Sequence, residues 1–272
     1  MIFQSDLHTH SNYSDGKTSV REMALGAEKA GLKVLGLSEH SPLEWQTEWC
    51  IKKEKLPEWS AEVDSVRAEL GERLTLLRGT ELDWCSDIDT GGFDYVIGST
   101  HELFVKPGVH RSVDESEKAM LFTVETFFHG DFYAYTKFYY ETLAKWASRP
   151  VIDILGHIDI VTKFNEGGKW FDENDARYLR PAEEAVEVLA AAGFIFEMNS
   201  GAISRGYRKS PYPSTAVLRM IHAHGGRVML GSDAHAPADI AFHFKDMAEL
   251  AQSCGFKTHM CWKNGGFAEE KW

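Results

Sequence analysis

The sequence predicts a single α/β domain built as a barrel of seven parallel strands, and three observations support this. Seven short runs of branched apolar residues are mostly separated by helical segments, which is typical of parallel strands with crossover helices. Each run ends in polar residues, and carboxyl ends of barrel strands meet at one rim. The 272 residues contain no linker, repeat or low-complexity tract. An open doubly wound sheet is the alternative, but its site residues would gather at one crevice instead of following every strand.

The first unit begins with a short apolar run, residues 2–7, followed directly by DLHTHSNYSDG. Side chains two apart in an extended chain share a face, so His8 and His10 can bind one metal ion. A helix is expected over 18–30, because Ser19 and Glu22 have capping-box spacing and Gly31 follows as a stop signal.

The later strands repeat this arrangement, and helices are expected between them near 57–70, 173–192 and 213–224. The segment 102–150 is longer than a strand-to-helix connection requires, and we interpret it as a helical, aromatic-rich insertion that packs on the barrel. Residues after Gly255 are expected to form a structural tail. The strand ends are His40 in KVLGLSEH, Glu81 in TLLRGTEL, His101 in FDYVIGSTH, His157 in VIDILGH, Asn199 and Ser200 in GFIFEMNS, and Asp233 and His235 in RVMLGSDAH.

These strand ends, together with the first motif, provide more metal ligands than one ion can use. Divalent Zn, Mn or Fe takes about four to six ligands, so the set indicates two or three ions with bridging groups. Glu81 is the natural bridge, since a carboxylate can span two metals. The predicted ligands are His8, His10, Asp15, His40, Glu81, His101, His157, Asp233 and His235.

Charge and composition restrict the partners. The 29 basic and 41 acidic residues give a net charge of −12, which argues against a nucleic-acid or anionic-membrane surface. We expect a small-molecule substrate and a cytoplasmic protein, because neither a signal peptide nor a membrane-spanning apolar run is present. The four cysteines lack C-x-x-C spacing and are interpreted as reduced thiols. The sequence does not predict an oligomeric state.

The motifs DLHTHSNYSDG, LSEHSP, GTELDW, IGSTH, LGHIDIVTKF, MNSGAISR and GSDAH resemble those of the polymerase-and-histidinol-phosphatase (PHP) family, from residue 6 to about 240. Within it they are similar to the histidinol-phosphate phosphatases. The resemblance implies a distorted (β/α)7 barrel with three metals. The implied ligand sets are His8, His10, Glu81 and Asp233 for the first metal, Glu81, His101 and His157 for the second, and Asp15, His40 and His235 for the third. Several members have histidine where this chain has Asp15.

A phosphate group entering an acidic protein needs fixed cations as well as metals. Arg205, Arg208, Lys209 and Lys163 follow strand ends, and the resemblance selects Arg205 and Lys163 for substrate phosphate. Asn199 and Ser200, which precede Arg205, are also expected to contact substrate. Glu102, Trp84 or Tyr207 could recognise a cationic amine and an imidazole.

We therefore expect a phosphomonoesterase in which metals sharing Glu81 activate a hydroxide that attacks phosphorus. Asp15, Asp233 or His235 would supply the proton that the leaving alkoxide needs. The resemblance implies hydrolysis of L-histidinol phosphate to L-histidinol and phosphate in histidine biosynthesis. The alternatives are a PHP phosphoesterase acting on nucleotides or other phosphorylated metabolites, a metal-dependent amidohydrolase, and a non-catalytic metal-binding module. The amidohydrolase is disfavoured because such barrels usually have eight strands and a bridging lysine or lone aspartate.

Overall fold

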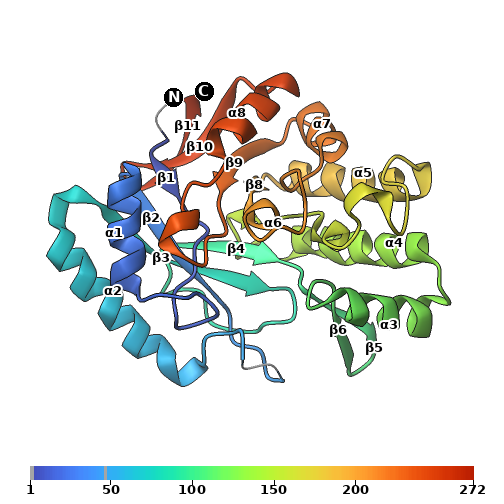
Figure 1. The fold of residues 1–272 in the computed structure, drawn as a ribbon, viewed down its shortest axis with the longest axis horizontal. Coiled ribbons are helices and arrows are strands. Elements are labelled where there is room, and N and C mark those ends of the chain that lie inside the picture. The colour runs from blue at the N-terminus through green and yellow to red at the C-terminus, as the bar shows by residue number, and fades with distance from the viewer. Residues whose placement is uncertain (1–2, 46–47) are drawn as a thin grey trace.

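The computed structural model describes residues 3–45 and 48–272, and its centre is a nearly closed barrel of seven parallel strands (Figure 1). Neighbouring strands in the order β1-β2-β3-β4-β7-β8-β9 are hydrogen-bonded in parallel. A parallel bridge between Thr9 and Ala234 joins the chain after β1 to the chain after β9. The predicted seven-stranded barrel is thus confirmed. Its strands are β1 (Ser5–Asp6), β2 (Val34–His40), β3 (Thr75–Asp83), β4 (Tyr95–Ser99), β7 (Ile154–Leu155), β8 (Ile195–Asn199) and β9 (Arg227–Gly231). Of the predicted first strand, residue 2 lies outside the described residues.

Helices surround this barrel, and local sequence signals explain where several of them begin and end. Helix α1 begins with the predicted capping box between Ser19 and Glu22 and ends at Gly31, whose φ of 84° favours glycine. Helix α8, which follows β9, was not predicted. No helix in 3–45 or 48–272 is long and apolar enough to cross a membrane. The helices are α1 (Val20–Ala30), α2 (Leu56–Leu70), α3 (Glu117–Phe128), α4 (Phe132–Leu143), α5 (Ala176–Ala191), the short α6 (Gly201–Ser204), α7 (Thr215–Ala223) and α8 (Phe244–Ser253).

The barrel interior is filled by apolar side chains from its strands, including Leu7, Leu77 and Ile154. Tyr95 fits among them because Gly36 and Gly79 have no Cβ where its ring lies. Strands β10 (Thr258–Lys263) and β11 (Gly266–Lys271) form an antiparallel hairpin, and Met260 of β10 packs in the same hydrophobic cluster as these interior residues. The expected structural tail is therefore a hairpin that packs against the barrel interior.

The segment 102–150 is helical only in part. Its first residues form an antiparallel hairpin, β5 (Glu102–Lys106) with β6 (Val109–Ser112), which the sequence analysis did not predict. Helices α3 and α4 follow. Tyr135, Tyr139 and Trp146 are fully buried in the main core, which agrees with the expectation that the aromatic residues pack on the barrel.

Candidate metal centre

The H-x-H pair after β1 lies at the barrel rim, where both imidazoles approach the same two carboxylates. His8 and His10 are at most 1% exposed. The His8 Nε2 atom lies 3.2 Å from Glu81 Oε2 and 3.8 Å from Asp233 Oδ1. The His10 Nε2 atom lies 3.6 Å and 3.3 Å from the same oxygens. Asp233 adopts a φ of 54° at the turn after β9, an uncommon conformation for a residue other than glycine. The first implied ligand set thus comes together.

Glu81, at the carboxyl end of β3, stands between this first set and the second. Its Oε1 atom lies 2.7 Å from His157 Nε2 and 3.3 Å from His101 Nε2, and it accepts a 2.7 Å hydrogen bond from Ser99. Burial alone would raise the pKa of Glu81, but the surrounding imidazoles hold this pKa well below its usual range. The carboxylate is therefore ionised and has oxygens directed at both ligand sets, as a bridging group requires.

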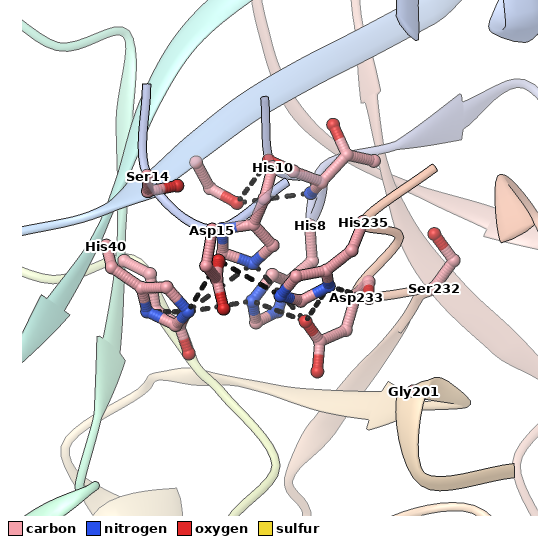
Figure 2. Close-up of polar contacts among 12 residues, drawn as sticks. His8, His10, Ser14, Asp15, His40, Gly201, Ser232, Asp233 and His235 are labelled. Atoms are coloured by element: carbon pink, nitrogen blue, oxygen red, sulfur yellow. Dashed lines mark hydrogen bonds and ion pairs between the residues drawn. The ribbon is translucent and has the colours of Figure 1, made fainter. Parts of the chain in front are cut away.

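The third set lies nearest the surface. Asp15 Oδ1 is 3.1 Å from His235 Nε2 and 3.5 Å from His40 Nε2, and the other ring nitrogen of His40 lies 2.8 Å from Glu81 Oε2. Figure 2 shows Asp15, His40 and His235 together with His8, His10 and Asp233 around a common space. The structure therefore brings all nine predicted ligands into one cluster.

Two observations test whether this cluster suits metal ions. His8 Nε2, His10 Nε2 and Glu81 Oε2 are buried without a hydrogen-bond partner among residues 3–45 and 48–272, although such atoms nearly always have one. Ligand atoms placed 2.0–2.2 Å from a tetrahedral ion are about 3.3–3.6 Å apart, close to the separations of the first set. Four groups of at least three possible ligands occur within the cluster. The donors fit two or three divalent ions, with Glu81 placed between the first two ligand sets.

A carboxylate that the sequence analysis missed supports these ligands from behind. Glu197 on β8 is 1% exposed, and its Oε1 atom lies 2.6 Å from His8 Nδ1. Its Oε2 atom accepts hydrogen bonds from the backbone N–H of His157 at 2.9 Å and from Asn199 Nδ2 at 3.0 Å. A carboxylate on the outer nitrogen of a ligating histidine fixes the tautomer that presents Nε2 to a metal. The sequence signal that could have revealed this role was the position of Glu197, an acidic residue within the mostly apolar strand sequence GFIFEMNS.

The predicted phosphate-binding cations border the cluster. Arg205 donates to Asp233 Oδ2 at 2.7 Å and to the Asp233 carbonyl at 2.9 Å. Gly201 leaves room for this pair, because a Cβ there would meet both partners. Lys163 pairs with Asp114 at 3.0 Å.

Asn199 and Ser200, which were also expected to contact substrate, differ in whether their side chains already have hydrogen-bond partners. Asn199 uses both polar ends within the protein, because its carbonyl oxygen accepts from Gly201 N and its amide donates to Glu197. This arrangement suits the positioning of Glu197 better than a substrate contact. The Ser200 hydroxyl is buried, and none of the described residues is its hydrogen-bond partner.

A cleft of about 450 Å³ opens onto the cluster, and its wall is acidic. Glu102 is 5% exposed, and burial together with the charges of Asp83 and Asp114 raises its pKa to about 8. Trp84 instead packs against Trp146, with ring centroids 5.2 Å apart. The cleft is lined by Asp15, His40, Glu48, Trp49, His101, Glu102, Asp114, Glu115 and Lys163.

Comparison with known proteins agrees with this geometry. The model of the PHP domain family matches residues 6–201. A Deinococcus radiodurans protein named "Probable histidinol-phosphatase" is 30% identical, with 93% of this chain and 94% of the relative covered. A Clostridium novyi protein named "Probable phosphatase" is 25% identical over 93% of this chain and 87% of its own length. A similar fold occurs in the Lactococcus lactis histidinol phosphate phosphatase crystallised with zinc, L-histidinol and phosphate. The TM-score is 0.72 and the sequence identity is 19%, and the alignment covers 97% of this chain and 98% of the Lactococcus chain.

Proposed function

Because this chain belongs to the PHP domain family, we propose that it is a metal-dependent phosphomonoesterase that hydrolyses L-histidinol phosphate to L-histidinol and phosphate. The observation that carries the proposal is the cluster of six imidazoles and three carboxylates arranged around Glu81, with Arg205 beside it. The names of the Deinococcus and Lactococcus proteins support this choice of substrate.

The ligand sets divide among two or three ions of Mn, Fe or Zn. His8, His10, Glu81 and Asp233 would hold the first ion, Glu81, His101 and His157 the second, and Asp15, His40 and His235 the third. Such ions supply Lewis acidity, lowering the pKa of water toward about 7 and offsetting charge on phosphoryl oxygens. Arg205 and Lys163 would bind oxygens of the substrate phosphate, and Ser200 offers a further donor.

The leaving alkoxide needs a proton, and we assign its donation to His235. The pKa of Asp15 is held well below its usual range, because the nearby imidazoles of His40 and His235 outweigh its burial. Asp233 is likewise held ionised by Arg205 and His8 against its burial. Both carboxylates therefore stay charged, which leaves His235, 3.1 Å from Asp15, as the group to which we assign the proton.

The acidic wall supports a cationic substrate. Glu102 and Asp114 line the cleft, and burial together with nearby carboxylates raises the pKa of Glu102 to about 8, so without a cation beside it this carboxyl is largely protonated at pH 7. An ammonium or imidazolium group beside Glu102 would lower that pKa. L-histidinol phosphate carries such groups, whereas nucleotides add negative charge that this wall repels. A binding role for nucleic acid is disfavoured by the same acidity and by the net charge of −12.

The test is a steady-state assay of L-histidinol phosphate against a panel of phosphomonoesters and phosphodiesters, with metal content measured on the same sample. We expect kcat/KM for L-histidinol phosphate to exceed that of the other esters by at least about 100-fold. The Glu102→Gln variant should lose much of that preference, while its turnover of aryl phosphates, whose leaving group carries no cation, changes little. Similar rates across the monoesters would favour a broad-specificity PHP phosphatase instead.

A further inference from the structure

A second group of possible metal ligands lies on the β10–β11 hairpin, which packs against the interior residues of the barrel. His259 and Cys261 are two residues apart on β10, so their side chains share one face. Glu270 on β11 is paired directly with His259 in the antiparallel register. The three side chains therefore meet across two strands of the hairpin, with Cys261 and Glu270 nine positions apart in the sequence.

The distances suit coordination of one ion. Ligand atoms of the three residues lie within 4.8 Å of one another, and Cys261 Sγ is 3.6 Å from Glu270 Oε2. A tetrahedral Zn²⁺ with a sulfur ligand near 2.3 Å and a nitrogen ligand near 2.0 Å places those atoms about 3.5 Å apart.

The surroundings of the ligands also favour a cation. Cys261 is 2% exposed, and the Nδ1 atom of His259 is buried with no hydrogen-bond partner in the part of the chain that the structure describes. The Trp272 ring stacks on the imidazole at 4.4 Å and fixes its plane. The Lys263 Nζ atom lies 3.4 Å from Glu270 Oε1, whereas Cys261 faces the second carboxylate oxygen, Oε2.

The protonation states agree with this arrangement. Burial lowers the pKa of His259, which keeps the imidazole in the neutral form that binds metals. Burial and the charge of Glu270 raise the pKa of Cys261 to about 11, so without a cation the thiol stays protonated. A metal ion would displace that proton to solvent and offset the negative charge of Glu270.

We propose that His259, Cys261 and Glu270 form a separate metal site for one zinc-class ion, which fastens β10 to β11 beneath the barrel. A thiolate ligand selects Zn²⁺ or Co²⁺ over Mn²⁺ and Mg²⁺. The fourth position is left to water, since His259 and Glu270 are partly exposed. This role is structural and independent of the hydrolysis proposed above.

Co²⁺ is the probe that separates the two centres, because a Co²⁺–thiolate bond gives a near-ultraviolet charge-transfer absorbance that nitrogen and oxygen ligands do not. The full-length protein is first saturated with Mn²⁺ and then titrated with Co²⁺. We expect this absorbance to saturate at one ion per chain. The Cys261→Ser variant should lose it completely, His259→Phe should weaken Co²⁺ binding while keeping the ring stack, and the control Cys254→Ser should behave as wild type.

Phosphatase activity and circular dichroism on the same samples show whether each variant is folded. If Cys261→Ser is misfolded, Glu270→Gln replaces it, with weaker Co²⁺ binding expected. Absence of the thiolate absorbance in folded wild-type protein would overturn the proposal. An absorbance that persists in folded Cys261→Ser would overturn it as well, since another cysteine would then be the ligand.

Discussion

Replacing Glu197 by glutamine should weaken metal binding without removing any predicted ligand. The carboxylate receives donors on both oxygens: His8 Nδ1 at 2.6 Å on one, and the His157 N–H and the Asn199 amide on the other. A glutamine has one acceptor oxygen, so its NH₂ group must face a donor. One buried donor then loses its partner, which costs about 1–3 kcal/mol.

Part of this cost appears as lost metal affinity, because His8 is no longer held with Nε2 toward Glu81. Outer partners of ligating histidines typically contribute a factor of about 10–100 in affinity, equivalent to about 1.4–2.7 kcal/mol. Phosphatase activity is measured against the concentration of added Mn²⁺ or Zn²⁺. The half-saturating metal concentration of Glu197→Gln should rise by that factor, while kcat at saturating metal stays near the wild-type value.

The matched control is Glu187→Gln on the exposed face of α5, which should leave the metal titration unchanged. A Glu197→Gln titration equal to that of wild type would refute the positioning role. Loss of activity that excess metal does not restore, in a variant with normal metal content, would also refute it.

Three further substitutions test the site and the fold. Glu81→Ala should abolish turnover and reduce bound metal, because two ligand sets share this carboxylate; near-normal activity would contradict the bridging role. Arg205→Gln should raise KM for the phosphoester more than it lowers metal content, as measured by steady-state kinetics and metal analysis. Burial raises the pKa of Asp159 from 3.8 to about 7, so its stabilising contribution is complete below pH 3.8 and is lost as the pH rises through about 7. Between pH 5 and pH 8 the wild type should lose about 2–3 kcal/mol more unfolding free energy than Asp159→Asn in urea titrations; equal pH dependence would contradict the buried neutral carboxyl.

The strand-end ligands could be predicted because they depend on local patterns. An apolar run identifies each strand, and a parallel barrel brings all carboxyl ends to the same rim. His8, His40 and Glu81 follow from this reasoning without knowledge of their contacts. The H-x-H spacing was ambiguous alone, and it gained meaning from the polar residues at the other strand ends.

The roles of Asn199 and Glu197 could not be predicted in the same way. Both lie on β8, and the strand pattern marks Asn199 as a rim residue available to substrate. Its amide instead bonds to Glu197, which in turn holds His8 of a different strand. Such pairings depend on how far each strand extends past its neighbour, and sequence spacing carries no measure of that offset.

The sequence by itself determined the seven-stranded barrel and which nine polar residues stand at its rim, because apolar periodicity and residue type are local properties of the chain. Only the tertiary structure decided what such residues contact: Glu197 behind His8, the acidic wall beside the cluster, and Cys261 near Glu270 on the closing hairpin. The first two join segments distant in sequence and the third joins two strands of one hairpin, and all three depend on strand register and burial.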